Sequence, residues 1–134
     1  MADFAFFMGD LNYRLNTTFA DLNNTNVMDD AIPMVQGKGD QLVLSRGEGF
    51  YPGYVEPLVE FLPTYKMEFN KGVYKEKKNQ APSYTDRILF KNNSNYKFCD
   101  DYYRCLHNVY GSDHRPVIRG ITIKGFGYPQ FAEI

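Results

Sequence analysis

The chain has 134 residues, of which 43% are hydrophobic and 23% charged, and its net charge is −1. This composition is that of one globular domain and excludes an intrinsically disordered chain. No apolar run reaches the roughly 18 residues that a membrane-spanning helix needs, and no secretory signal is apparent, so we expect a cytoplasmic protein. The two cysteines, Cys99 and Cys105, are too few for a disulfide scaffold, and we expect both to be reduced, packed thiols.

The first half of the chain is predicted to hold one strand and two helices. Residues 4–8 form a short apolar run followed by a glycine, which is typical of a buried strand that stops at a turn. Thr18, or the threonine before it, is a suitable N-cap for a helix over residues 19–31, which Pro33 should end or kink. A short second helix is expected over about residues 39–46.

The second half is predicted to alternate irregular segments with strands. Glycines and prolines from residue 47 to 57 indicate an irregular loop, and residues 59–63 suggest an edge strand. Residues 70–82 are expected to form a mobile, basic loop. Mixed apolar and polar positions then predict three strands, at residues 86–91, around 102–109 and at 117–124.

The small net charge conceals opposite charges on the two halves. Residues 1–60 carry nine acids and three bases, giving −6, whereas residues 61–134 carry seven acids and twelve bases, giving +5. Seven bases and three acids lie between residues 66 and 91, enough to attract a polyanion, although a solvated loop is the simpler interpretation. The chain lacks the overall basicity of typical nucleic-acid-binding domains, so nucleic acid is not the expected partner.

Three clusters place chemically active residues beside apolar strands. They are residues 9–14 (Gly-Asp-Leu-Asn-Tyr-Arg), 82–89 (Pro-Ser-Tyr-Thr-Asp-Arg-Ile-Leu) and 112–116 (Ser-Asp-His-Arg-Pro). Together they supply three Asp, one Asn and one His, at strand ends where α/β proteins commonly hold their sites. That set suits metal-assisted phosphoryl chemistry, although each motif alone is weak, since Asp-x-Asn is more often a turn or a cap. His107 has no such neighbours and is expected to be a surface or packing histidine.

The order and wording of these clusters resemble the inositol polyphosphate 5-phosphatases of the endonuclease/exonuclease/phosphatase superfamily. The family signatures W-x-G-D-x-N-Y/F-R, P-A/S-W-x-D-R-I/V-L and S-D-H-K/R-P-V match residues 7–14, 82–89 and 112–117, in that order. The resemblance implies an α/β (α+β) architecture, the DNase I-like sandwich of two sheets with outer helices. The family domain is longer, so residues 1–124 correspond to its C-terminal half and residues 125–134 to a C-terminal tail.

The resemblance also implies catalytic roles for the matching residues. Asp10 would activate the attacking water, Asn12 would hold a non-bridging oxygen of the scissile phosphate, and His114 would donate to the same phosphate. Asp86 would orient the imidazole, and Asp113 would lie close to the metal ion. The implied metal is Mg²⁺, whose main ligand in the family, a Glu, has no counterpart in this chain.

A second group of residues is implied in substrate binding. Tyr65, Lys66 and Lys78 match positions that reach the phosphate next to the one cleaved. Arg14 and Arg87 are candidates for phosphate contact, with the equally good alternative that each pairs with buried carboxylates near the site.

The chain departs from the family pattern at several positions. It has no tryptophan, and Phe7 and Tyr84 stand where the first two signatures have Trp. Gln80 stands where many members carry a base, which weakens the expected recognition of the neighbouring phosphate. The upstream half has no counterpart, and its absence would leave the apolar inner face of this half uncovered.

The sequence therefore predicts, for the complete domain, magnesium-dependent hydrolysis of the 5-phosphate of phosphoinositide lipids or soluble inositol polyphosphates, at the periphery of membranes. A first alternative is a non-catalytic fragment that binds phosphoinositide or a complementary N-terminal half. A metal-dependent nuclease of the same superfamily is a weaker alternative, because the signature over residues 82–89 and the pair Tyr65-Lys66 are peculiar to the phosphatases.

Overall fold

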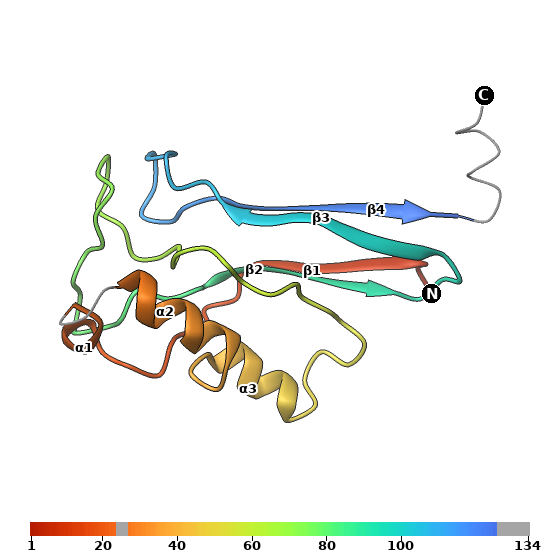
Figure 1. Cartoon of the computed structure of the whole chain (residues 1–134), viewed down its shortest axis with the longest axis horizontal. Coiled ribbons are helices and arrows are strands. Elements are labelled where there is room, and N and C mark those ends of the chain that lie inside the picture. The colour runs from red at the N-terminus through yellow and green to blue at the C-terminus, as the bar shows by residue number, and fades with distance from the viewer. Residues whose placement is uncertain (24–26, 126–134) are drawn as a thin grey trace.

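The structure, a computed structural model, describes residues 1–23 and 27–125 (Figure 1). The elements in chain order are β1 (Phe4–Asp10), α1 (Phe19–Asn23), α2 (Val27–Gln36), α3 (Gln41–Gly47), β2 (Asp86–Asn92), β3 (Lys97–Cys105) and β4 (Val117–Lys124). The predicted tail lies outside the described residues from position 126 onward. Within the described ranges, no helix is long and apolar enough to cross a membrane.

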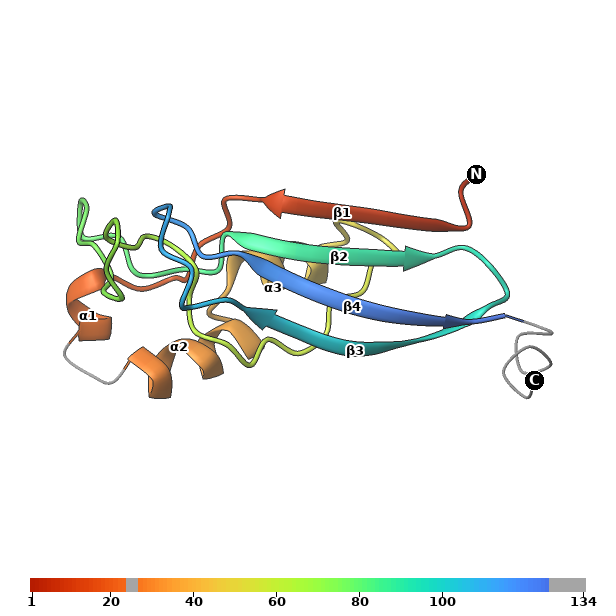
Figure 2. The ribbon, with the colours of Figure 1, turned by 90° about the horizontal axis from the view of Figure 1, so that it is seen from above.

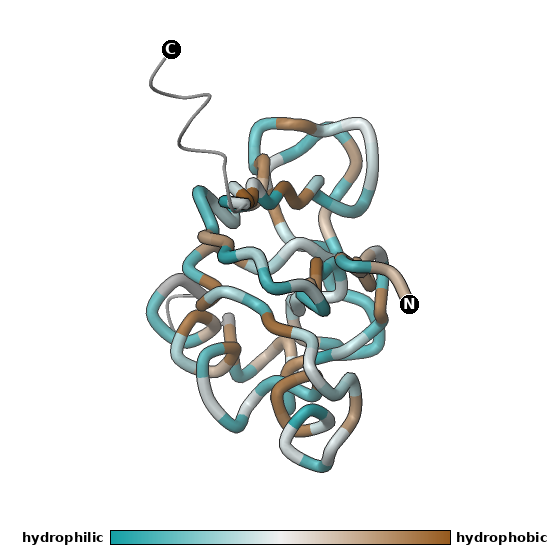
Figure 3. Tube along the Cα trace, turned by 90° about the vertical axis from the view of Figure 1, so that its right-hand side faces the viewer, coloured by the Kyte–Doolittle hydropathy of each residue, from teal (hydrophilic) through white to brown (hydrophobic). Residues whose placement is uncertain are grey.

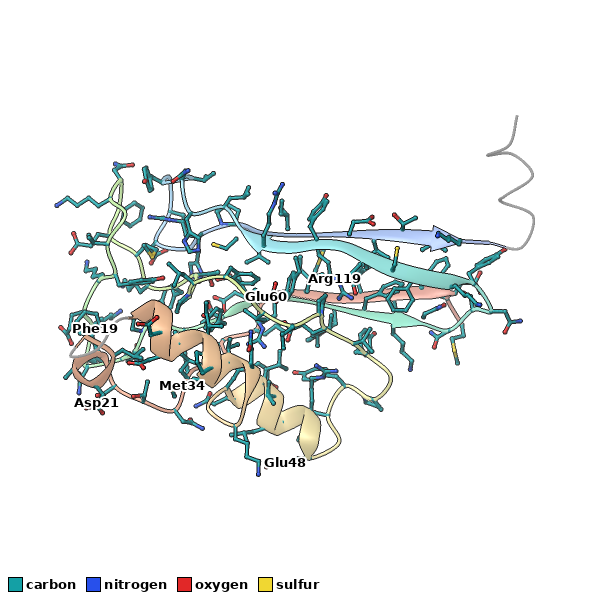
Figure 4. All side chains as sticks on the ribbon, viewed as in Figure 1. Phe19, Asp21, Met34, Glu48, Glu60 and Arg119 are labelled. Carbon is teal, nitrogen blue, oxygen red and sulfur yellow. The ribbon has the colours of Figure 1, made fainter. Side chains whose placement is uncertain are left out.

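Two antiparallel strand pairs form two layers, with the helices outside them. Strand β1 pairs with β2, and β3 pairs with β4 (Figures 1 and 2). Helices α2 and α3 lie on the side of β1–β2 that faces away from β3–β4. Arg119 of β4 links the layers, because its Nη1 donates to the carbonyl oxygens of Ile88 at 2.9 Å and Val55 at 3.1 Å (Figure 4). The expected sandwich with outer helices is confirmed.

The core lies between α1, α2 and the segments that lead into β2. Figure 3 shows how hydrophobic and hydrophilic residues alternate along the chain. Tyr84 is fully buried and donates its hydroxyl hydrogen to the carbonyl of Phe61 at 2.7 Å, so this aromatic substitution for Trp keeps a packed ring. The buried residues of this core are Leu15, Leu22, Ala31, Val35, Val59, Phe61, Ala81, Tyr84 and Cys105.

The helices begin where the capping residues predict. The Thr18 hydroxyl accepts from the Asp21 amide at 3.2 Å, and the Asp40 carboxylate accepts from the Val43 amide at 3.2 Å. The helix predicted over residues 19–31 is present as α1 and α2, on either side of residues 24–26, which lie outside the described part. Of the two outcomes expected at Pro33, an end or a kink of the helix, the end is wrong, because α2 runs on to Gln36.

The segment 59–63 is not the predicted edge strand. Its carbonyl groups accept hydrogen bonds from side chains instead of from a neighbouring strand: Gln36 donates to Val59, and Tyr74 donates to Pro63, at 2.7 and 2.8 Å. The other strand predictions are closer. β2 and β4 lie where expected, whereas β3 begins and ends several residues earlier than predicted.

Strand β1 is not the buried strand that its composition predicts. Phe6, Phe7 and Met8 are 53%, 41% and 64% exposed. Among the described strands β1 pairs with β2 alone, so it also has a free edge. This agrees with the expectation that an apolar surface of this half is uncovered.

The two cysteines differ in a way that the sequence did not predict. Cys105 is buried, and this burial raises the pKa of its thiol to about 12, whereas Cys99 on β3 is exposed. We therefore expect iodoacetamide at pH 8 to modify Cys99 at least tenfold faster than Cys105, as peptide mass spectrometry would measure. A Cys99→Ser variant should lose the fast reaction, and guanidinium should equalise the two rates; fast labelling of Cys105 in the folded protein would contradict the burial.

Candidate active site

Asp86 and His114 form the best-ordered pair of the site. The Nδ1 atom of His114 lies 2.9 Å from Oδ2 of Asp86, the first residue of β2. The same carboxylate oxygen accepts from the hydroxyls of Thr64 and Thr85, at 2.6 and 2.9 Å. Three partners thus fix the carboxylate, which in turn fixes the imidazole with Nδ1 toward Asp86 and Nε2 outward.

Asp10 lies across from this pair because β1 and β2 end together. Asp10 is opposite Asp86 in the antiparallel register, and its Oδ2 lies 3.8 Å from Nε2 of His114. The Asp10 side chain is about half exposed, so water can reach it. The structure thereby brings the first, second and third sequence clusters to one place, as the motifs predicted.

Asn12 sits in a tight turn directly after β1. Its backbone has a φ of 62°, and its amide donates to Oδ1 of Asp10 at 3.0 Å. The side-chain oxygen of Asn12 accepts from Nη2 of Arg14 at 2.7 Å. Because Arg14 occupies that oxygen, the side-chain nitrogen of Asn12 is the group suited to donate to a phosphate oxygen.

Aromatic stacking joins the catalytic pair to a basic recess. The rings of Tyr65 and His114 stack with centroids 4.3 Å apart, and the guanidinium of Arg14 lies 4.9 Å from the Tyr65 centroid. Beyond Tyr65, the recess is lined by Arg14, Tyr65, Lys66, Lys75, Lys77, Gln80 and Ala81.

The recess contains two lysines that the sequence analysis did not select. Lys75 and Lys77 line it, whereas Lys78, which the resemblance singled out, is exposed and does not. The high density of lysine in this segment was the available signal for Lys75 and Lys77.

Arg87 has the surroundings of the structural alternative, in which it pairs with buried carboxylates near the site. It is 1% exposed, its Nε and Nη2 donate to Glu56 at 2.7 and 2.8 Å, and its Nη1 donates to Asp40 at 3.0 Å. Burial acts to lower the pKa of Arg87, but hydrogen bonds and attraction from both carboxylates outweigh it and raise that pKa. Burial also raises the pKa of Asp40, against the lowering effect of Arg87. The Arg87 side chain is fully enclosed by these partners.

His107, in contrast, is a packing histidine. It is partly buried, and its Nε2 is enclosed without a hydrogen-bond partner among the described residues. Burial lowers its pKa, with a smaller contribution from Arg115. It is therefore separate from the site and serves as a reference histidine for experiments.

A larger, mainly apolar cavity of about 480 Å³ adjoins the other side of His114. Its walls come from the ends of β1 and β2 and from the start of β4, and include Met8, Ile88 and Val117. Asp86 and His114 thus both line this cavity, and His114 also stacks on Tyr65, which lines the basic recess.

The described residues supply only part of a metal site. Asp10, Asn12 and Asp113 offer the oxygen ligands that Mg²⁺ prefers. However, no group of three or more His, Cys, Asp or Glu side chains in residues 1–23 and 27–125 is arranged to hold a metal ion. The Asp113 backbone carbonyl accepts from Met67 at 2.8 Å, which fixes its loop beside the recess. The described part therefore does not complete a metal site by itself.

Residues 1–120 match the sequence profile of the endonuclease/exonuclease/phosphatase family 2. The chain belongs to this family. Its similarity to human phosphatidylinositol polyphosphate 5-phosphatase type IV, at 34% identity over 127 residues, covers 91% of the chain and 19% of that phosphatase. The resemblance to inositol polyphosphate 5-phosphatases is confirmed.

Solved structures of family proteins show the same fold. The inositol polyphosphate 5-phosphatase domain of a synaptojanin, in complex with inositol (1,4)-bisphosphate and calcium, matches with a TM-score of 0.74 and 25% identity, covering 98% of this chain and 38% of that one. The nitrophorin of Cimex, as a ferrous NO complex, matches with a TM-score of 0.75 and 32% identity, covering 91% and 42%. The chain thus spans less than half the length of these relatives.

Proposed function

We propose that this family member, within a complete catalytic domain, hydrolyses the 5-phosphate of phosphoinositides or soluble inositol polyphosphates. The observation that carries the proposal is the His114 imidazole, hydrogen-bonded to Asp86 at Nδ1, facing Asp10 at Nε2 and stacked on Tyr65. Two of the similar proteins are named as a phosphatidylinositol polyphosphate 5-phosphatase and an inositol polyphosphate 5-phosphatase domain, which supports this reaction. The site also contains the groups that a phosphomonoester needs: a carboxylate, an amide and an oriented imidazole.

The proposed chemistry assigns one task to each group. Asp10, which water can reach, takes a proton from the attacking water. Asn12 donates its side-chain N–H to a non-bridging phosphate oxygen, and His114 donates from Nε2 to the same phosphate. Asp86 holds the imidazole so that Nδ1 keeps its proton and Nε2 points at the substrate. The water oxygen bonds to phosphorus as the bond from phosphorus to the inositol oxygen breaks, and the departing inositol oxygen takes a proton from solvent, so no covalent intermediate with the protein is needed.

Mg²⁺ is the proposed cofactor, with Asp113 and the oxygens of the Asp10–Asn12 turn as the contribution of this chain. When bound, the ion would neutralise charge on the phosphate. Because the described residues do not complete its coordination, the remaining ligands must come from elsewhere in the complete domain.

The basic recess is the proposed site for a second phosphate of the substrate. Lys66, Lys75 and Lys77 line it beside Tyr65, and Gln80 offers an amide where many family members have a base. In this proposal one phosphate of the inositol ring lies at His114 and another lies against the lysines at the mouth of the recess. We propose a cytoplasmic protein that acts on lipid or soluble substrates at the membrane periphery.

The proposal is tested by phosphate release from phosphatidylinositol 4,5-bisphosphate, with Mg²⁺ and with EDTA. We expect metal-dependent release from the complete domain, and a loss of about 10²-fold or more in Asn12→Ala and in His114→Ala. His107→Ala is the matched control and should retain the rate. Activity that survives in His114→Ala would overturn the assignment, and Mg²⁺-dependent nicking of plasmid DNA would support the nuclease alternative instead.

The second candidate is a non-catalytic role for this polypeptide, as a binding half. Two observations favour it: the exposed Phe6, Phe7 and Met8 on β1, and the incomplete metal site. A stable complex with a complementary N-terminal half, or phosphoinositide binding without turnover, would support it. Metal-dependent turnover by the isolated 134-residue chain would remove it.

A further inference from the structure

A hairpin over residues 67–74 carries exposed apolar side chains away from the body of the protein. Met67 and Tyr74 pair across its base, and the amide of Glu68 donates to the carbonyl of Val73 at 2.9 Å. The base is anchored, since Met67 is 3% exposed and the Tyr74 hydroxyl donates to Pro63. Beyond that base, Phe69 is 63% exposed and Val73 is 53% exposed.

A second loop, between β3 and β4, stands beside this hairpin. Its exposed apolar side chains are Val109 and Tyr110, at 46% and 39%. Arg115 is 1% exposed and joins the two loops, because its Nη2 donates to the carbonyl of Lys71 at 2.7 Å while its guanidinium lies 4.9 Å from the Tyr110 ring centroid. Figure 1 shows both loops projecting at the same end of the molecule. We call Phe69, Val73, Val109 and Tyr110 the apolar tip.

Positive charge surrounds the apolar tip. Residues 66–78 contain five lysines and two glutamates and no other charged side chain, a net charge of +3. Lys71 lies in the hairpin turn, where its Nζ is 3.8 Å from the Glu68 carboxylate, and Lys75 follows Tyr74 at the base; both lysines are exposed. Apolar side chains set among lysines are characteristic of surfaces that lie in the interface of an anionic bilayer, where the rings and aliphatic groups enter the headgroup layer and the ammonium groups contact phosphates.

The apolar tip is close to the candidate active site. The amide of Met67, at the base of the hairpin, donates to the carbonyl of Asp113, the neighbour of His114. Lys66 lines the recess next to Tyr65, which stacks on His114. A bilayer resting on the apolar tip would therefore lie beside the recess that receives the phosphorylated headgroup.

We propose that the apolar tip docks the protein on anionic bilayers, with Phe69 and Val73 inserted into the interface. The relation of this docking to catalysis rests on the proposed function, but the docking itself is independent of turnover. The partner is the surface of an anionic bilayer, whose lipids supply the negative charge that complements the lysines.

The first test is sedimentation of the whole chain with vesicles of phosphatidylcholine and phosphatidylserine, a mixture that lacks the substrate phosphates. We expect Phe69→Ser/Val73→Ser to lower the partition coefficient about tenfold or more. Phe50→Ser is the matched control, because Phe50 is 58% exposed but lies directly after α3, outside the apolar tip. Equal binding by the tip variant and the wild type, or an equal loss in Phe50→Ser, would overturn the proposal.

Two further binding measurements identify which group on the vesicle the protein recognises. Vesicles of phosphatidylcholine alone should bind the wild type at least tenfold more weakly, because they lack the charge that complements the lysines. Soluble inositol 1,4,5-trisphosphate should leave binding to phosphatidylserine vesicles largely intact. Full displacement by it would assign the binding to the basic recess and overturn the role of the apolar tip.

A tryptophan probe reports insertion directly, because the chain has no tryptophan of its own. The emission of Phe69→Trp should shift to the blue on anionic vesicles and be quenched by brominated lipid, whereas Phe50→Trp should show neither change. An unshifted Phe69→Trp would contradict insertion even if the protein sediments. In the complete domain, hydrolysis of the soluble trisphosphate should be unaffected by Phe69→Ser/Val73→Ser; absence of any hydrolysis would refute the proposed function and leave the docking result valid.

Discussion

Asp86→Asn is expected to lower phosphate release by the complete domain about 10²- to 10⁴-fold while the protein stays folded. The carboxylate of Asp86 accepts from Nδ1 of His114 at 2.9 Å. If the amide presents its N–H₂ to the ring, Nδ1 must act as the acceptor, and the imidazole adopts the opposite tautomer. Nε2 can then still donate from the neutral ring, but no carboxylate compensates the positive charge of a ring protonated at both nitrogens, so His114 stabilises the charge on the phosphate less well while its position is kept.

The Asp86→Asn variant needs a readout that separates orientation from folding. Thr64 and Thr85 donate to the same oxygen as His114, so an amide nitrogen placed there turns their hydroxyls from donors into acceptors, and we expect the thermal midpoint to fall modestly while the protein stays folded. We expect kcat to fall with a small change in KM, together with an altered pH–rate profile. Asp101→Asn, an exposed position on β3, is the matched control. A rate within threefold of the wild type would show that Asp86 does not position the imidazole.

The sequence alone predicts that Asp10, Asp86 and His114 come together, because these residues lie at or next to strand ends. Asp10 ends β1 and Asp86 begins β2, and two antiparallel strands that pair over their whole length must bring those ends together. His114 lies just before β4, which also starts at this edge. Local patterns therefore determine the cluster once the strands are recognised.

Contacts between irregular segments that lie far apart in the sequence could not be predicted from local patterns. Thr64, which holds Asp86, comes from a segment without regular structure, and Glu56, which binds Arg87, is separated from it by 31 residues. No periodicity relates such positions. The same limit applies to Lys75 and Lys77, because a segment rich in lysine does not show which of its lysines line the recess.

Strand β1 shows a different limit of sequence patterns. An apolar run predicts a strand that needs burial, but not what buries it. Phe6 and Met8, which alternate onto the same face of β1, are more than half exposed because the described residues leave most of that face uncovered. The apolar pattern therefore predicts the strand itself. The burial of its side chains depends on the residues around the strand and cannot be derived from the segment alone.

Arg87→Met is expected to lower the free energy of unfolding by about 3–5 kcal/mol, because it leaves two carboxylates buried without their shared cation. Glu56 would keep only the Tyr103 hydroxyl, which donates to it at 2.7 Å, and Asp40 is fully buried. Urea unfolding followed by circular dichroism measures the loss. Arg104→Met is the matched control: Arg104 is exposed on β3, and its removal should change stability by no more than about 0.5 kcal/mol. A folded Arg87→Met protein of wild-type stability with a raised KM would instead return Arg87 to the substrate site, contrary to its enclosure by Glu56 and Asp40.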